Sequence, residues 1–583
     1  MKEITPITLE VLRNALLTVA EEMGVGLQRS AYSSNIKTRL DFACAIFDSE
    51  LKNIVQALHI PSLLGAMVNL VPRAVEIFGA ENFRPGDGII VNDPHMGGTH
   101  LPDITLISPV FHGPELFGYV ANVAHHQDVG GMAPGSVPGD STEIHQEGLI
   151  IPPMRLLEGG RIRRDVLGLI LANVRSPRER AGDYRAQVAC NNLGIRRLGE
   201  VIERYGAETL RLYMEEILNY TERRMRAAMR AIPSGTYHAE DYLDSDGITG
   251  RPVKVAAEVT IDGDEATVDL SGSDGQGPGP VNATFGPTLS AVSYIFKCLC
   301  DPDIPINDGM YRPLHIIAPE GAVVNARPPA AVAGCWEVAQ RVCDVLVKAL
   351  SRVLPEKVCA AGKGIICNIS FGGTDPRSGK VYTFYETIGG GYGARPTKDG
   401  IDGIQYHLTN TQNAPVEEIE LSYPVLVERY ELIPDSEGAG KFRGGLGMRR
   451  DYRFIGGPAI FSVQSDRAKF APWGLFGGLD ATPSRYTVNP DSDEPLELPS
   501  KSTVRLKPGD IVSVQTPGGG GYGSPLERDP EMVLRDIIDG KVSLKRAEQL
   551  YGVVVDLTPR KVDYEATGSL RQSPKAASRG EAR

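Results

Sequence analysis

The chain of 583 residues has no uninterrupted apolar run that approaches the roughly 20 residues needed to cross a bilayer. It also has no excess of basic residues, because 61 Lys and Arg are opposed by 73 Asp and Glu, a formal net charge of -12. The first residues, MKEITPITLEVL, lack the basic start and apolar core of a secretory signal. We therefore expect a cytoplasmic protein with neither a membrane nor a nucleic-acid partner.

Paired cysteines are also absent. The eight cysteines are dispersed and none forms a CxxC motif; they lie at Cys44, Cys190, Cys298, Cys300, Cys335, Cys343, Cys359 and Cys367. This pattern favours buried reduced thiols over a disulfide framework or a zinc-thiolate cluster.

Nucleotide and serine-hydrolase motifs are missing as well. Gly518, Gly520 and Gly523 fit GxGxxG, but SPLERDP follows where a dinucleotide fold needs a helix, so tight turns are the preferred interpretation. The stretch EGAGKF at 437–442 lacks the first glycine and the Ser/Thr of a P-loop, and no GxSxG elbow is present. Any chemistry should therefore depend on a metal.

Metal-ligand residue types are concentrated between Val91 and Glu147. Six of the ten histidines fall in this stretch, with carboxylates among them: His95, His100, His112, His125, His126, His145, Asp93, Asp103, Asp128, Asp140, Glu143 and Glu147. Such a density of imidazole and carboxylate groups indicates a metal site. Any one of these histidines is also compatible with a polar turn or a hydrogen-bonded core position.

The local pattern supports a common site. Residues 86–94 read as a short strand running into an Asn-Asp-Pro turn, and 103–111 and 116–126 read as two further strands. His100 and Asp103 then lie on the loop that enters the second strand, and His125 lies at the end of the third. An antiparallel meander would bring the three together at strand ends, where chemistry is commonly placed.

Elsewhere, periodicity predicts amphipathic helices at 8–29 and 61–78 and a long helical section at 167–232. Asp41 opens the apolar strand DFACAIFD, and the pattern leaves open whether it is a turn residue or a carboxylate directed into a site. After residue 235 the sequence pattern predicts mainly short β-strands. Helical insertions are predicted at 290–299 and 334–354, and a final pair of helices is predicted beyond residue 530.

The predicted fold class is α+β, a multi-lobed chain with a metal-binding strand meander in the N-terminal half and a β-rich C-terminal half. Four regions are expected: 1–232 with the metal site, 233–360 of mixed β/α structure, 361–565 of Gly-rich β structure with C-terminal helices, and 566–583 as a disordered tail.

Several stretches together resemble the hydantoinase B/oxoprolinase family: SSNIKTRLDFACAIFD, GDGIIVNDPHMGGTHLPD, NVAHHQDVGG, INDGMYRPL, GGGYGAR and the ending GGGGYGSPLERDPEMVLRDIIDGKVS. They extend over nearly the whole chain to about residue 555. The resemblance implies the metal-binding subunit of an ATP-dependent hydantoinase, 5-oxoprolinase or lactamase.

The resemblance also implies site residues. The family's metal ligands correspond to Asp41 in RLDFA, His100 and Asp103 in THLPD, and His125 in VAHHQD. This mixed nitrogen and oxygen set suits zinc, manganese or iron and does not choose among them. The remaining candidates for acid-base catalysis are His126, Asp128, His145 and Glu147.

The implied reaction is the ring opening of a cyclic amide. A partner, a hydantoinase A-like ATP-binding subunit, would use ATP to phosphorylate the carbonyl oxygen. The metal would lower the pKa of a bound water and present hydroxide to the activated carbon. A hetero-oligomer of the two subunits is expected.

Two alternatives remain. The chain could be the large subunit of an acetone- or acetophenone-type carboxylase, although those subunits tend to be longer. It could also be a non-catalytic scaffold for the ATP-binding subunit, against which the complete set of four ligand residues argues.

Overall fold

The computed structural model describes residues 4–558 and 560–572. Its N-terminal region is built on a seven-stranded antiparallel sheet of order β2-β1-β5-β4-β3-β6-β7. The strands are β1 (Phe42–Asp48), β2 (Asn53–Gln56), β3 (Gly88–Val91), β4 (Asp103–His112), β5 (Glu115–His125), β6 (Met154–Glu158) and β7 (Arg161–Ile162). The predicted meander is therefore confirmed as β3, β4 and β5.

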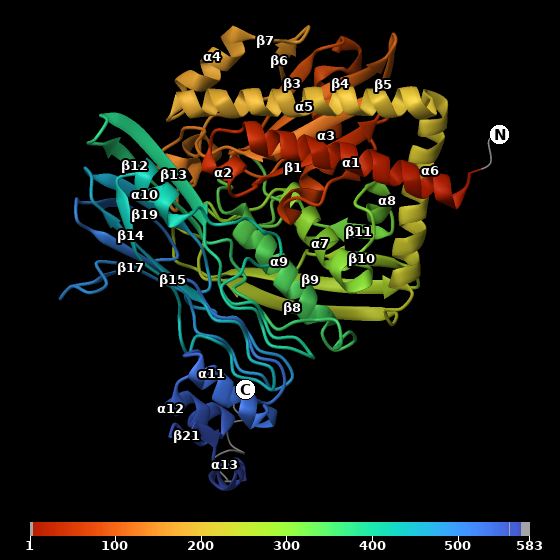
Figure 1. Cartoon of the computed structure of the whole chain (residues 1–583). Coiled ribbons are helices and arrows are strands. Elements are labelled where there is room, and N and C mark those ends of the chain that lie inside the picture. Colours follow the sequence, from red (N-terminus) through yellow and green to blue (C-terminus); the bar gives the residue numbers. More distant parts are fainter. Residues whose placement is uncertain (1–3, 559, 573–583) are drawn as a thin grey trace.

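Both faces of this sheet are buried. Along β1, Cys44 and Ile46 join the core under α1 (Pro6–Ser30) and α5 (Pro177–Tyr205), whereas Ala43 and Ala45 join the core on the opposite side with α3 (Leu64–Phe78). Successive side chains of a strand point to opposite faces, so a strand covered on both sides reads as a continuous apolar run. Figure 1 shows α1 and α5 lying side by side across the sheet.

The predicted helical section is observed as three helices, α4 (Arg164–Ala172), α5 and α6 (Ala207–Met229). Gly206 separates α5 from α6 with a positive φ of 86°, and α6 then runs at a steep angle to α5 along the edge of the molecule (Figure 1). In this way α6 links the N-terminal sheet to the central region. Among the described residues, no helix combines the length and apolar character needed to cross a bilayer.

The central region contains a four-stranded sheet of order β11-β10-β9-β8. Its elements are β8 (Gly235–Leu243), β9 (Val253–Asp262), β10 (Glu265–Asp269), α7 (Phe285–Cys300), α8 (Asp308–Tyr311), β11 (Leu314–Ile317) and α9 (Cys335–Leu350). Helix α9 packs on β8 and β9 and on α7, and nearly every one of its residues is buried. It therefore lies in the centre of the molecule (Figure 1).

The C-terminal region contains two antiparallel sheets that share one apolar core. Their orders are β13-β12-β16-β19 and β14-β15-β20-β17-β18. The elements are β12 (Asn368–Asp375), β13 (Lys380–Thr387), α10 (Val416–Ser422), β14 (Val425–Leu432), β15 (Met448–Phe454), β16 (Ala459–Gln464), β17 (Arg485–Val488), β18 (Leu496–Leu498), β19 (Lys501–Leu506) and β20 (Ile511–Gln515).

The glycine-rich stretches form a bundle of extended segments, so the tight-turn interpretation is wrong for residues 518–521. Segments 389–393, 444–447 and 518–521 lie against one another and exchange backbone hydrogen bonds, such as Gly519 N to Gly445 O at 2.9 Å and Gly445 N to Tyr392 O at 2.8 Å. A Cβ on Gly519 would lie 2.1 Å from Tyr392 O. Glycine is required there because the neighbouring atom belongs to the backbone and cannot move aside.

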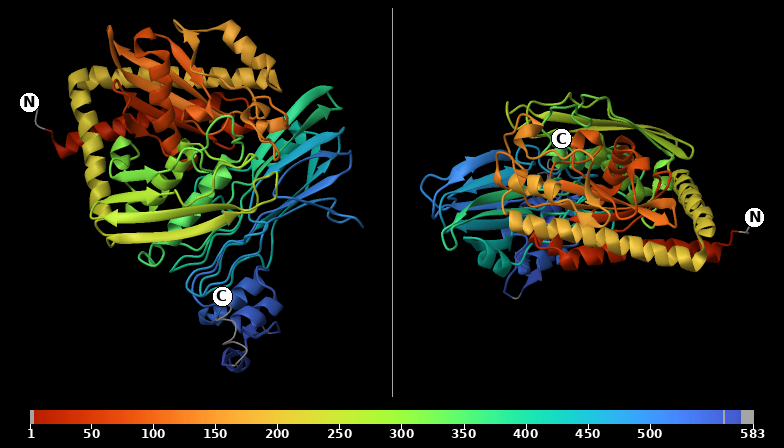
Figure 2. Two further views of the ribbon diagram at one scale, coloured as in Figure 1. Left: turned by 180° about the vertical axis from the view of Figure 1, so that it is seen from behind. Right: turned by 90° about the horizontal axis from the view of Figure 1, so that it is seen from above.

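The bundle leads to a small helical lobe that projects from the body, as the left view of Figure 2 shows. The lobe contains α11 (Pro530–Ile538), α12 (Leu544–Arg546), a π-helical turn (Ala547–Tyr551), β21 (Val555–Asp556), β22 (Lys561–Val562) and α13 (Tyr564–Arg571). The predicted disordered tail is thus wrong for residues 566–571, where Thr567 is buried. Residues 573–583 of that prediction lie outside the described residues.

The mixed α+β fold class is confirmed: most of the long helices lie in the N-terminal half, and sheets occur in the N-terminal, central and C-terminal regions. One hydrophobic core, however, includes residues from Ala43 to Leu408 and joins the first predicted regions to each other. The domain boundaries therefore stay a prediction.

We expect Gly519→Ala to lower the free energy of unfolding by at least about 2 kcal/mol, because its methyl group would overlap the Tyr392 carbonyl. The matched control is Gly199→Ala on α5, where a Cβ would meet nothing within 4 Å and where alanine favours the helix by about 0.5–1 kcal/mol. Calorimetric melting of the two full-length variants measures both effects. A Gly519→Ala protein that melts with the wild type would contradict the packing argument.

Candidate metal centre

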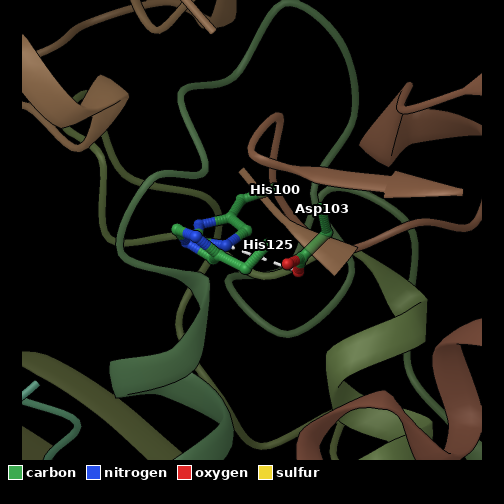
Figure 3. Close-up of side chains that lie close together, drawn as sticks. All are labelled: His100, Asp103 and His125. Carbon is green, nitrogen blue, oxygen red and sulfur yellow. Dashed lines mark ion pairs between the residues drawn. The ribbon is translucent and has the colours of Figure 1, made fainter. Parts of the chain in front are cut away.

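Three of the predicted ligands meet at one end of the N-terminal sheet. Asp103 is the first residue of β4 and His125 the last residue of β5, and the two are directly paired across the strands. His100 lies on the preceding loop, held by the bond from Asp103 N to His100 O at 3.1 Å. Figure 3 shows the three side chains pointing toward one another.

The ligand atoms of His100, Asp103 and His125 lie within 4.8 Å of one another, and all three residues are buried. His100 Nε2 is 3.3 Å from Asp103 Oδ2, and the two imidazole rings have centroids 4.9 Å apart. The Thr99 hydroxyl donates a hydrogen bond to Asp103 Oδ2. The meander thus forms a compact cluster of two nitrogen ligands and one oxygen ligand.

Burial and charge act together on these groups. Burial by itself would lower the pKa of His100, but the Asp103 carboxylate outweighs it and raises that pKa. Burial opposes ionisation of Asp103, yet His100 lowers the pKa of the Asp103 carboxyl. Burial, followed by the neighbouring His100, holds the pKa of His125 well below its ordinary value. His125 is therefore neutral at pH 7, the form that binds metals.

Asp41 borders the cluster but is not one of its three members. It lies just before β1, and its backbone oxygen accepts a hydrogen bond from His125 N at 3.0 Å. With Asp103 and His125 it lines a cavity of about 20 Å³, which is room for about one water molecule. Burial raises the pKa of Asp41 to about 7. Asp41 therefore lines the same small cavity as two predicted ligands.

Sequence reasoning missed the residues that orient His125. Asn35 Nδ2 lies 2.9 Å from His125 Nδ1 and donates to His125 O at 2.7 Å. Tyr385 on β13 stacks on the ring with centroids 4.4 Å apart and an interplanar angle of 14°. The buried Arg39 donates to Tyr385 O at 3.0 Å. Asn35 and Arg39 fall within a family-like stretch, but no pattern in the sequence could have related Tyr385 to His125.

Trp336 was also missed. It lies in the first turn of α9, and its indole N–H donates to His100 Nε2 at 3.4 Å. It is one of only two tryptophans in the chain, and this rarity is the one signal that could have identified it. The centre is therefore enclosed by the N-terminal meander, the start of α9 and a strand of the C-terminal half.

The residues present fit a divalent metal. His100 Nδ1 and His125 Nε2 are buried and have no hydrogen-bond partner among the described residues, which is costly unless something binds them. Together with the carboxylates of Asp103 and Asp41 they provide a mixed set of nitrogen and oxygen donors, which suits zinc, manganese or iron.

His126 and Asp128 make other contacts. His126 Nε2 lies 2.9 Å from Gln187 Oε1 on α5, and burial lowers the pKa of His126 to about 4. Asp128 accepts hydrogen bonds from the backbone N–H groups of Gly130, Gly135 and Arg175. Asp128 therefore holds its own loop in place, and neither side chain belongs to the three-residue cluster.

Glu147 and His145 differ sharply in their surroundings. His145 is exposed on the short helix Ile144–Gln146. Glu147 is buried and accepts hydrogen bonds from Val332 N and Ala333 N at 3.0 and 2.9 Å. Burial raises the pKa of Glu147 to about 7, and His100 is among the charges that act on it. Glu147 therefore combines burial with an electrostatic influence from His100. His126 is buried as well and interacts electrostatically with Asp103 and His125.

We expect the purified chain to carry about one metal ion per protein and His100→Ala to lose it, because one of three clustered ligands is removed. The control is His112→Ala, a histidine exposed at the end of β4, which should retain the metal. Elemental mass spectrometry of both variants measures the content. Equal metal in the two variants would place the ion elsewhere.

Asn35→Ala should weaken metal affinity about 10- to 100-fold, because His125 loses the side chain that orients its ring. Asn69→Ala, which removes a bond from the Asn69 side chain to Gly97 O, serves as the comparison. Competition with a fluorescent chelator measures both affinities, and circular dichroism verifies that the fold is kept.

A family model for hydantoinase B/oxoprolinase matches residues 5–525 of the chain. An uncharacterized protein of Methanocaldococcus jannaschii is 42% identical over 97% of this chain and 99% of its own length. A protein of a Pseudomonas species that is named as a putative subunit of a D-/L-hydantoinase is 36% identical over 98% of this chain and 99% of its own length.

Two solved structures are similar to this chain over nearly its whole length. The ATP-dependent caprolactamase of Pseudomonas jessenii is 32% identical and superposes with a TM-score of 0.91, over 98% of this chain and all of that chain. An acetone carboxylase superposes with a TM-score of 0.92 over 99% of this chain and 84% of that chain, but at 21% identity it shows the fold alone. Since the family model and the relatives extend over nearly the whole molecule, the chain belongs to the hydantoinase B/oxoprolinase family.

Proposed function

We propose that this chain is the metal-dependent subunit of an ATP-dependent enzyme that opens cyclic amides, such as hydantoins, 5-oxoproline or lactams. The observation that carries the proposal is the buried His100, Asp103 and His125 cluster with its unpartnered imidazole nitrogens. Relatives named as part of a hydantoinase and as a caprolactamase support the substrate class. ATP would be used by a hydantoinase A-like partner, in a hetero-oligomer.

Four residues would hold the metal: Asp41, His100, Asp103 and His125. A divalent ion held there would supply Lewis acidity, lowering the pKa of water and polarising a carbonyl oxygen. The chain's own residues do the rest. Asn35 and Tyr385 orient His125, and the small cavity lined by Asp41 admits about one water-sized group.

We assign proton transfer to Glu147. Its pKa of about 7 lets the carboxyl both take up and release a proton at neutral pH. The bonds from Val332 N, Ala333 N and the Ser141 hydroxyl hold its oxygens in place. His126, Asp128 and His145 are less favoured, because the first two are engaged elsewhere and His145 is exposed.

The test is an ATP-coupled assay of this chain mixed with its candidate ATP-binding partner, across hydantoins, 5-oxoproline and lactams. We expect ring-opened acid to form only with ATP, both chains and bound metal. Glu147→Gln should reduce kcat by a factor of about 10² to 10⁴, the usual range for a lost acid-base group. His112→Ala is the control and should match the wild type.

Product identity separates the alternatives. A carboxylase would add carbon dioxide to a ketone, which mass spectrometry distinguishes from a ring-opened acid. A scaffold would support full turnover by the partner when His100 and Asp103 are both changed to alanine. Either result would overturn the proposed hydrolysis.

A further inference from the structure

Strand β8 forms a free edge of the central sheet. The sheet order is β11-β10-β9-β8, and β8 pairs with β9 in one unbroken antiparallel register from Gly235 to Leu243. Figure 1 shows β8 as the outermost strand on this side of the sheet. Among the described residues, its far side therefore has no neighbouring strand, and such an edge is a template to which another extended chain can be added.

Two hydrogen bonds show which backbone groups face this edge. Glu240 O accepts from Lys348 Nζ at 3.1 Å, and Tyr242 N donates to the side chain of the preceding residue at 2.8 Å, so both residues direct their backbone away from β9. The direction alternates along an antiparallel strand. Thr236 and His238 therefore also direct N–H and C=O to the free edge, and in the described part of the chain neither has a backbone group bonded on that side.

A groove of about 650 Å³ follows the open part of the edge. It is lined by four consecutive residues of β8, Thr236 to Ala239, and by none of β9, so it lies along the free side of the strand. The last turn of α9 and the residues that follow it also line the groove, together with Leu475 and Phe476. Four residues of strand span about 13 Å. The open backbone groups thus face a space that an added strand can enter.

The groove is positively charged, although the whole chain has a formal net charge of -12. Lys348 and Arg352 line it, and none of the described residues that line it is Asp or Glu. Arg352 is exposed and makes no ion pair with any described carboxylate. His238 is not counted, because it shares the outer face of the sheet with Glu240 and Glu258. The charge of the groove therefore complements a segment that carries carboxylates.

An aromatic ring is exposed at the same groove. Phe476 is 47% exposed and has a φ of 51°, in the left-handed region that a bulky residue rarely adopts. Its ring packs against Tyr522 with centroids 5.1 Å apart. Backbone strain of this kind is concentrated at binding sites, and aromatic side chains are enriched in interfaces. The groove therefore offers an apolar contact beside its two cations.

Helix α9 connects the groove to the metal centre. Lys348 lies in its last turn, and Trp336 in its first turn donates to His100. The roughly twelve residues between them span about 18 Å of helix. A chain docked at the groove is therefore anchored within one helix length of the metal ligands.

We propose that the free edge of β8 is a docking site for an extended acidic segment of the ATP-binding partner subunit, which adds to β8 as a further strand. The inference rests on the proposed function, which requires that partner. Carboxylates of the segment pair with Lys348 and Arg352, its backbone bonds to Thr236 and His238, and an apolar side chain contacts Phe476.

The test is the affinity of the full chain for its candidate ATP-binding partner, measured by biolayer interferometry without substrate or ATP. His238→Pro removes one N–H from the free edge and leaves the pairing with β9 intact, because proline is tolerated where the N–H faces away from the neighbouring strand. We expect it to weaken binding at least about fivefold. His238→Ala keeps the N–H, and this matched control should bind as the wild type does.

Arg352→Glu tests the charge of the groove. It should weaken binding at least about tenfold at low salt and reduce the salt dependence, because an attractive charge becomes a repulsive one. Arg505→Glu makes the same charge change at an exposed position of β19, outside the groove, and should leave the affinity unchanged.

The outcomes separate this inference from the proposed function. If the partner binds the wild type and binds His238→Pro and Arg352→Glu equally well, the docking site is overturned and the proposed function is not. If the wild type does not bind the partner at all, both are overturned. Light scattering of the isolated chain tests the other occupant: a wild-type oligomer that His238→Pro dissociates would assign the edge to a second copy of this chain and overturn the proposal.

Discussion

Buried charge is the constraint on which the arrangement of this molecule depends. Helix α9 carries Arg341 and Asp344 into the interior, where they pair with Asp241 of β8 at 2.9 Å and with Arg467 of the C-terminal region at 2.6 Å. Leaving such an ion unpaired costs roughly 3–5 kcal/mol. The helix is therefore held in one position against both regions, and its first turn presents Trp336 to His100.

The metal centre shows why the two halves cannot be considered separately. The meander provides the His100, Asp103 and His125 cluster, but Tyr385 of the C-terminal sheet stacks on the His125 ring. Arg39 joins the Tyr385 backbone to the segment that holds Asn35. Orientation of a ligand by its neighbours normally decides metal affinity as strongly as the ligand itself. The C-terminal half is therefore part of the site and more than a support for it.

Enclosure has a chemical consequence. The side chains of His100, Asp103 and Asp41 are buried, and their removal from water strengthens the electrostatic interactions among them.

The sequence by itself determined the α+β class, the meander and the clustering of His100, Asp103 and His125, because strand periodicity and the register of an antiparallel pair are local properties: Asp103 and His125 meet where β4 and β5 pair. It could not determine the role of the glycine-rich stretches, which read as turns and proved to be close-packed extended segments. Nor could the sequence relate Asn35, Trp336 and Tyr385 to the site. It also could not show that Glu147 is buried whereas His145 is exposed. Those distinctions depend on burial and on contacts between residues far apart in the chain, which only the tertiary structure decides.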